Sequence, residues 1–469
     1  MSSDLRSAPG IRAPRVLQRS MRVMGTLLLT LSSVTPASSV FVFVPTVIQE
    51  AGSGALWSMI AAALLSFPIA FVYAELASAF PIAGGEYCML GRTLGPGWGF
   101  AMLGLILFGN MLTVTALALG ATPYLDVIWP DLNPTAVAIA IIVSTTLLAI
   151  LHVRTNAWVT GIFLLLELLA LAVLAALGLL HGVRPVGDLL FHPVTLAGGS
   201  LVQTPLALIG LATTVSVSAY YGFSSAIYFT EEMHEAPRLI GRTIFWAVII
   251  TILTELVPVA AVLIGAPDLK WLIASSNPFG EFVRARGGHL LYDVISLAIA
   301  FAIINAALAT LLQNARFLFS TGRDLAWHPH INDGFTRTHA RYHSPWIATL
   351  AAGGSSILTC FLGLKLVLVL TGTGIVLTYA GVCAAALAGR YIGSTNHASF
   401  RIWLFPWMPI MGLTMCAVII VASWFDPDIG RPSLIANGAA IALAMAYYVF
   451  VLRPRGGWVL RAPEQEARE

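Results

Sequence analysis

Three glutamates lie inside long apolar segments, where an ionisable side chain is costly. Glu167 stands among leucines, Glu255 lies near Pro258, and Glu75 lies toward the end of an apolar run. Ionisable groups at membrane depth face an internal partner or an ion pathway. A carboxylate can take up a proton on one side of a membrane and release it on the other when its surroundings change. We therefore predict proton-coupling roles for Glu167 and Glu255. The structural alternatives are an interhelical hydrogen bond and, for Glu255, a bond to backbone that Pro258 frees.

Small polar residues interrupt two of the apolar segments. The first interruption contains Thr35, Pro36, Ala37, Ser38 and Ser39, and the second contains Ser218, Tyr220, Tyr221 and Gly222. Irregular backbone is tolerated at membrane depth where it is buried or lines a wet cavity. Freed N–H groups suit a carboxylate, and freed carbonyls suit an ammonium group. We predict that both interruptions bind substrate, although small residues could also serve close helix packing. Asn110 and Asn305 are further polar candidates for this site.

The elements that carry these residues are predicted to be membrane-spanning helices. Hydrophobic residues make up 58% of the 469 positions, charged residues only 10%, and the mean hydropathy is +0.85, which excludes an ordinary soluble domain. Apolar stretches of about 20 residues recur along the chain. Twelve spans are predicted, near residues 27–49, 56–80, 98–124, 134–151, 158–180, 201–229, 244–264, 291–319, 346–362, 364–388, 402–424 and 434–452.

The charged residues predict the orientation of these spans. Residues 1–22 contain five arginines and no signal-peptide core, and residues 453–469 form a second polar tail. Most of the 25 basic residues fall on one side of the membrane if both termini are cytoplasmic. We expect a multi-pass protein of the plasma or inner membrane. The net charge of +3 requires no nucleic-acid partner.

The sequence shows no pattern that predicts an enzyme. The four cysteines are scattered over apolar segments, the histidines fall in loops or at span ends, and there is no phosphate-binding loop. We expect no catalytic residue, metal or cofactor. An intramembrane enzyme is a remote alternative, and so is a non-transporting sensor, for which no segment is long enough to form a soluble signalling domain.

Three stretches resemble the amino acid–polyamine–organocation superfamily of permeases. They are ELASAFPIAGGEYCMLGRTLG at 75–95, AYYGFSSAIYFTEEMHEAPRLIGRTI at 219–244, and NARFLFSTGRD at 314–324. The resemblance implies an all-α membrane protein with about twelve spans, a five-plus-five inverted-repeat (LeuT-like) core, and discontinuous first and sixth spans. The repeats would cover residues 23–181 and 200–388, with two extra spans at 401–452.

The resemblance implies secondary active transport of an amino acid by alternating access, coupled to a proton or to an exchanged solute. It places Glu167 where some relatives carry a lysine near a cation site. Glu75, Glu86, Arg238 and Arg323 fall in the matching loops and are expected to be gating or structural residues, with Glu75 paired to a neighbouring arginine.

The chain departs from the family pattern at the expected site. Relatives commonly have Gly-x-Gly where this chain has Ala37, Ser38 and Ser39, and many have an acid where it has Ser224. The first difference admits a polyamine or other organic amine as an alternative substrate, and the second removes one partner for a cation.

Overall fold

The computed structural model describes residues 23–460, except for residues 82, 83, 128, 152–156, 234, 343, 457 and 459. The predicted N-terminal tail and most of the C-terminal tail lie outside the described residues.

The described chain is almost entirely helical. Its first part consists of α1 (Val23–Val34), α2 (Pro36–Ala51), η1 (Gly52–Gly54), α3 (Ala55–Ala79), α4 (Glu86–Thr93), α5 (Pro96–Gly120), α6 (Thr122–Leu125), α7 (Pro134–Ile150), α8 (Ala157–Leu180), α9 (Val186–Phe191) and a hairpin of β1 (Val194–Ala197) and β2 (Ser200–Gln203). Its second part consists of α10 (Leu206–Tyr220), η2 (Phe223–Glu232), α11 (Ala236–Gly265), α12 (Leu269–Ala274), α13 (Pro278–Arg323), α14 (Pro329–Thr336), α15 (Trp346–Thr359), η3 (Cys360–Leu362), α16 (Leu364–Ile392), α17 (Trp407–Phe425), α18 (Gly430–Tyr447), η4 (Tyr448–Leu452) and η5 (Arg453–Arg455).

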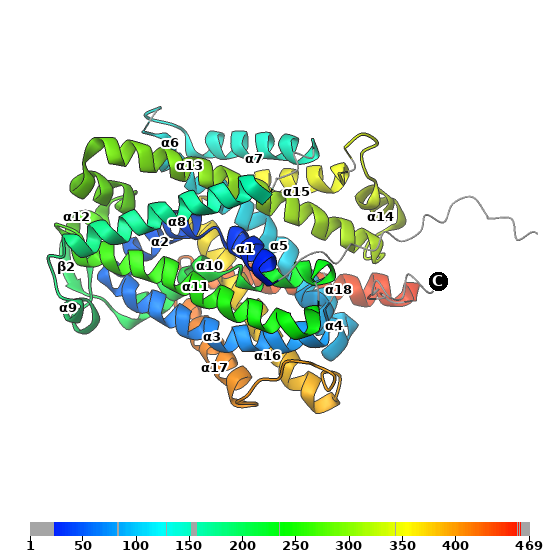
Figure 1. Cartoon of the computed structure of the whole chain (residues 1–469). Coiled ribbons are helices and arrows are strands. Elements are labelled where there is room, and N and C mark those ends of the chain that lie inside the picture. The colour runs from blue at the N-terminus through cyan, green and yellow to red at the C-terminus, as the bar shows by residue number, and fades with distance from the viewer. Residues whose placement is uncertain are drawn as a thin grey trace, which may run out of the picture.

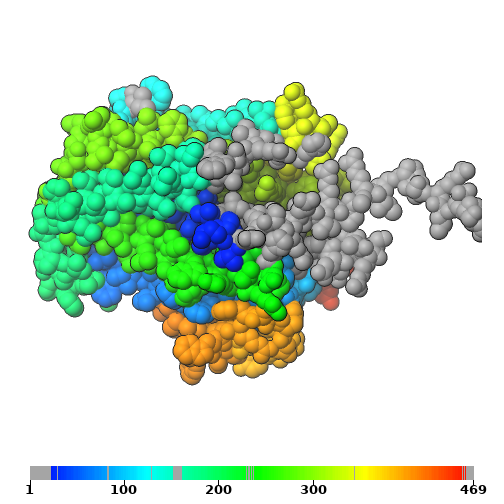
Figure 2. All heavy atoms as spheres, viewed as in Figure 1, coloured from blue at the N-terminus to red at the C-terminus, as the bar shows by residue number. Residues whose placement is uncertain are grey.

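The helices identify a polytopic membrane protein. Within the described residues, nine helical segments are long and apolar enough to cross a bilayer, and two shorter apolar ones lie at Pro134–Ile150 and Trp346–Leu362. Helix α8 lies on the outer face of the bundle (Figure 2). Leu165 and Leu169 of this helix are exposed. Large apolar side chains that are exposed on a helix suit a surface that contacts lipid.

Three predicted boundaries are wrong. The predicted sixth span begins at Leu201, but this residue lies in β2, which pairs antiparallel with β1 across a turn at Gly198 and Gly199. The predicted seventh span begins at Ile244, but α11 begins at Ala236 and includes Arg238 and Arg242. Similarly, α13 extends back to Pro278 through a kink at Gly288 (φ 83°, ψ 174°). Because the first turns of α11 and α13 contain charged residues, the apolar pattern of the sequence did not indicate that these helices begin there.

The connections gather at the two ends of the bundle (Figure 1). The β1–β2 hairpin, α9 and α12 lie at one end, which we call the hairpin end, and α4 and α14 lie at the other, the α14 end. Between them α10 packs against α2 and α3, and α11 packs along α3 and α8. The residues at the two interruptions, Thr35 and Gly222, are buried between these helices.

Candidate substrate-binding and coupling site

The first interruption lies between α1 and α2. Thr35 has left-handed backbone angles (φ 49°, ψ 66°), and Pro36 begins α2. Because Pro36 has no N–H, the carbonyl of Ser32 lacks the donor that a continuous helix would supply. The Ser39 hydroxyl crosses the break and donates to the Val34 carbonyl at 3.1 Å. This helix therefore divides into two half-helices at the polar cluster.

The second interruption lies between α10 and η2. Tyr221 is extended (φ −65°, ψ 143°), and Gly222 has φ 119°, which L side chains rarely adopt. A Cβ atom at Gly222 would stand 3.1 Å from Cα of Val34. The two interruptions therefore touch through their backbones, and Gly222 is required both for the turn and for this contact.

A cavity of about 70 Å³ lies beside the contact between the two interruptions. Six of the predicted substrate-binding residues line it: Thr35, Ser39, Asn110, Ser218, Tyr221 and Gly222. Of the described residues in its lining, none carries a charge. The hydroxyl oxygens of Ser218 and Ser225 are buried in this lining and have no hydrogen-bond partner. Because unpaired buried hydroxyls are costly, the lining is suited to a polar ligand.

Four predicted substrate-binding residues lie outside this lining: Ala37, Ser38, Tyr220 and Asn305. Among the lining residues that were not predicted from the sequence are the polar residues Tyr228, Thr310 and Asn314. Asn314 follows Thr310 by four residues and shares its helical face, whereas Asn305 lies about 140° around the helix from Thr310. That spacing could have identified the polar face of α13.

Glu167 lies on the other side of the first turn of α2. Its side chain is 2% exposed, and its Oε2 accepts the Ala37 N–H at 3.2 Å. The backbone N–H of Ser38 also interacts with this carboxylate. A helix N-terminus has free N–H groups and a partial positive charge, so a carboxylate is stabilised there. Glu167 of α8 therefore caps the N-terminus of α2, so it forms an interhelical hydrogen bond, which was the structural alternative. Its proton-coupling role stays a prediction.

Glu255 of α11 is fully buried, and neither carboxyl oxygen has a hydrogen-bond partner among the described residues. It does not bond to backbone freed by Pro258. It lies within electrostatic reach of Glu167 and of Tyr220, whose buried hydroxyl also has no partner. We call Glu167, Glu255 and Tyr220 the acidic face of the interruption, and the lining described above the cavity face.

Glu86 holds a wall of the cavity in place. Its carboxylate accepts the Tyr228 hydroxyl at 2.8 Å and the Tyr73 hydroxyl at 3.0 Å. Gly85 (φ 65°) packs under the Tyr228 ring, which would stand 2.7 Å from a Cβ atom there. Burial raises the pKa of Glu86. The Gly-Gly-Glu part of the signature thus positions Tyr228, consistent with the structural role expected of Glu86.

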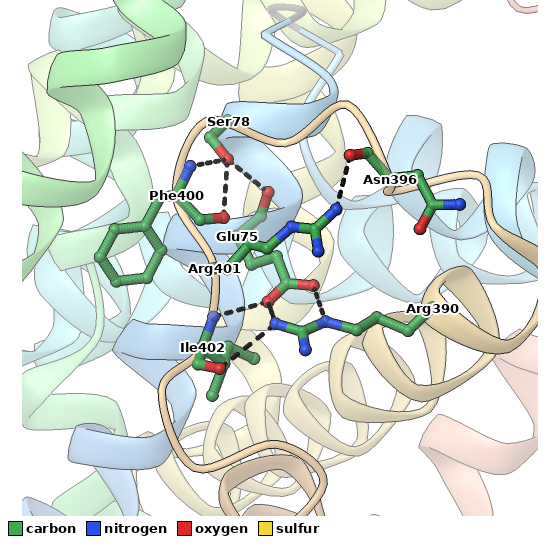
Figure 3. A network of polar contacts seen from close by, with 7 residues as sticks. All are labelled: Glu75, Ser78, Arg390, Asn396, Phe400, Arg401 and Ile402. Carbon is green, nitrogen blue, oxygen red and sulfur yellow. Dashed lines mark hydrogen bonds and ion pairs between the residues drawn. The ribbon is translucent and has the colours of Figure 1, made fainter.

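The other predicted gating residues lie apart from the cavity. Glu75 pairs with Arg390 of α16 through two contacts of 2.7 and 2.6 Å (Figure 3), and not with an arginine near it in sequence. Its carboxylate also accepts the Ile402 N–H at 2.8 Å. Arg323 lies 3.6 Å from Asp324, and Arg238 is exposed in the first turn of α11. Glu75 therefore joins α3 to α16 and to the segment before α17.

The comparisons with known proteins agree with this architecture. The sequence profile of the family described as amino acid permease matches residues 22–451. An uncharacterised transporter of Mycobacterium tuberculosis is 25% identical, with 93% of this chain and 92% of that protein covered. A branched-chain amino acid permease of Bacillus subtilis is 22% identical over 86% of this chain and 88% of its own length. A methylthioribose transporter of the same organism is 22% identical, covering 85% and 87%.

The relatives are named as transporters, in accord with a bundle whose two broken helices meet at a polar cavity. Since the family profile covers nearly the whole chain, this protein belongs to the amino acid permease family of the amino acid–polyamine–organocation superfamily.

Proposed function

We propose that this protein is a secondary active transporter that moves an amino acid across the plasma membrane by alternating access. The observation that carries the proposal is the uncharged cavity at the meeting point of two broken helices, with a buried carboxylate on the far side of the same helical turn. Half-helix ends offer partial charges of both signs, so they suit a zwitterion.

The cavity lining favours an amino acid over a polyamine. A polyamine carries several positive charges, and buried charges need partners. The described lining residues supply hydroxyls, amides and aromatic rings but no carboxylate. A relative named as a branched-chain amino acid permease supports the same choice. Another relative is named as a methylthioribose transporter, and methylthioribose is an uncharged solute, so the test must include this compound.

The proposed architecture has twelve spans and both termini in the cytoplasm. The first of the nine long candidates contains α1–α2 and α3, and the shorter α7 and α15–η3 complete the set of twelve. The interruption in α1–α2 begins the first group of five spans, and that in α10–η2 begins the second, as expected for inverted repeats. In this proposal the α14 end, where arginine-rich loops lie, faces the cytoplasm, in accord with the positive-inside rule.

The energy source in this proposal is a proton gradient or solute exchange. Glu167 and Glu255 are the proposed coupling acids, because both are buried at membrane depth without a basic partner among the hydrogen bonds and ion pairs of the described residues.

The test is uptake into proteoliposomes that contain the purified protein, with and without an inward proton gradient. The panel comprises radiolabelled amino acids, putrescine, spermidine and methylthioribose. We expect an amino acid to accumulate, and to accumulate further with the gradient or with a trans amino acid. Uptake of a polyamine or of methylthioribose without any amino acid would overturn the substrate assignment, and liposomes without protein are the control.

A further inference from the structure

Each backbone N–H group in the first turn of α2 has an identified acceptor. Pro36 has no N–H, and the Ser39 N–H donates to the Thr35 carbonyl at 2.9 Å. The Ala37 N–H donates to Glu167 at 3.2 Å, and the Ser38 N–H faces the same carboxylate. A carboxylate from α8 therefore occupies the anion position of this half-helix.

The same turn borders the cavity. Thr35 and Ser39 line the cavity on one side of the turn, while Glu167 lies on the other. The buried hydroxyl of Ser38, in this turn, and that of Ser218, in the cavity lining, have no hydrogen-bond partner. The described lining carries no charge, so the positive partner that this turn can offer to a substrate carboxylate is the α2 N-terminus, whose N–H groups belong to Ala37 and Ser38, between the lining residues Thr35 and Ser39 in sequence.

Two ionised carboxylates at one helical turn repel each other, because a dry interior screens charges poorly. The basic residues of α11 and α13 lie toward the ends of these helices, and the hydrogen bonds and ion pairs of Glu167 within the described part of the chain include no basic partner. The α11 residue facing it is Glu255, α1 has no titratable residue, and Glu50 at the far end of α2 is paired with Lys365. The middle of α13, residues 294–315, has no titratable residue either.

We propose that Glu167 is a built-in competitor for the carboxylate group of the substrate. When ionised, Glu167 holds the Ala37 and Ser38 N–H groups; when it takes up one proton and becomes a neutral carboxylic acid, it yields them to the substrate carboxylate. Each carboxylate-bearing substrate then binds together with one proton, and an amine without a carboxylate binds without one. This inference rests on the proposed function and specifies its coupling as proton symport.

The inference is tested by binding measurements on the purified full-length protein. Isothermal titration calorimetry with L-leucine, in two buffers of different ionisation enthalpy, counts the protons taken up, and Kd is measured from pH 5 to pH 9. We expect uptake of one proton and, above the titration of Glu167, a Kd that rises about tenfold per pH unit. Isoamylamine, which is leucine without its carboxylate, should bind without proton uptake.

Glu167→Gln mimics the protonated acid, so its Kd for leucine should not change with pH and no proton should be taken up. Glu50→Gln removes a carboxylate at the far end of α2, where Glu50 is paired with Lys365, and is the matched control; it should retain the pH slope of the wild type. Size-exclusion elution checks that each variant is folded.

Leucine binding without proton uptake in the wild type, or a pH slope that survives in Glu167→Gln, would overturn the competition while leaving amino acid transport intact. Binding of isoamylamine but not of leucine at any pH would instead overturn the proposed substrate class, and the competition with it.

Discussion

The two faces of the α1–α2 interruption differ in kind. The cavity face presents hydroxyls, amides and aromatic rings without a charge among its described residues, whereas the acidic face holds two carboxyl groups in a dry interior. A single helical turn separates them, because Thr35 and Ser39 face the cavity and Ala37 binds Glu167. In the proposed function, helix dipoles on the cavity face bind the substrate, while the two carboxyl groups on the acidic face couple its transport to a proton.

Among the substitutions considered, Gly222→Val is expected to reduce transport most. The substitution forces a β-branched residue into φ 119° and drives its Cβ toward Val34, so the cavity face cannot form. We expect proteoliposome uptake to fall at least about 100-fold, since a misplacement of about 1 Å in a site already has that effect.

Gly109→Ala is the control for this substitution, because a Cβ there meets no atom within 4 Å. It should transport like the wild type. Wild-type uptake by Gly222→Val would show that the contact between the two interruptions does not shape the cavity.

Glu255→Leu should separate stability from function on the acidic face. The buried carboxyl group has no hydrogen-bond partner, so its removal relieves a desolvation cost of about 1–3 kcal/mol. We expect a higher Tm in detergent together with reduced gradient-driven accumulation. A lower Tm would mean that Glu255 is held by interactions that stabilise the fold.

Ser218→Ala should affect substrate recognition alone. It removes an unpartnered hydroxyl from the cavity lining, and the loss of one hydrogen bond to substrate, about 0.5–1.5 kcal/mol, raises KM by roughly 2- to 13-fold. The pH dependence of uptake should not change, because the acidic face is untouched. A shifted pH profile would show that the Ser218 hydroxyl takes part in proton coupling.

Glu86→Gln should change the thermal stability only slightly. Unlike Glu255, Glu86 is a buried acid with a hydrogen bond at each carboxyl oxygen. Burial raises the pKa of Glu86, so the folded protein binds this proton more tightly than the unfolded chain does. Its stability contribution therefore falls as pH rises above the ordinary value of 4.5. The Tm of Glu86→Gln relative to wild type should rise between pH 4 and pH 8, by no more than a few degrees. Parallel Tm curves for the two proteins would contradict this account.

The apolar segments and both interruptions could be predicted from the sequence, because polar residues and proline at membrane depth break a strong pattern. The sequence does not show which face of the α2 turn each residue occupies, so the contact of Ala37 with Glu167 and the position of Ala37 and Ser38 outside the cavity lining were not predicted. Glu75 pairs with Arg390, a partner 315 residues away in sequence that no local pattern indicates. Such pairings depend on helix packing, which a single sequence does not specify.

The small volume of the cavity also limits the rate at which a substrate binds. At about 70 Å³ it is well below the roughly 300 Å³ at which ligand pockets begin, so a solute of amino acid size enters only when the surrounding helices move apart. Association then waits for a minor open population, and the observed on-rate is the diffusional value multiplied by that population. A substitution that keeps the helices apart would speed capture without adding a contact, and the same looseness would shorten the time for which each captured molecule is held.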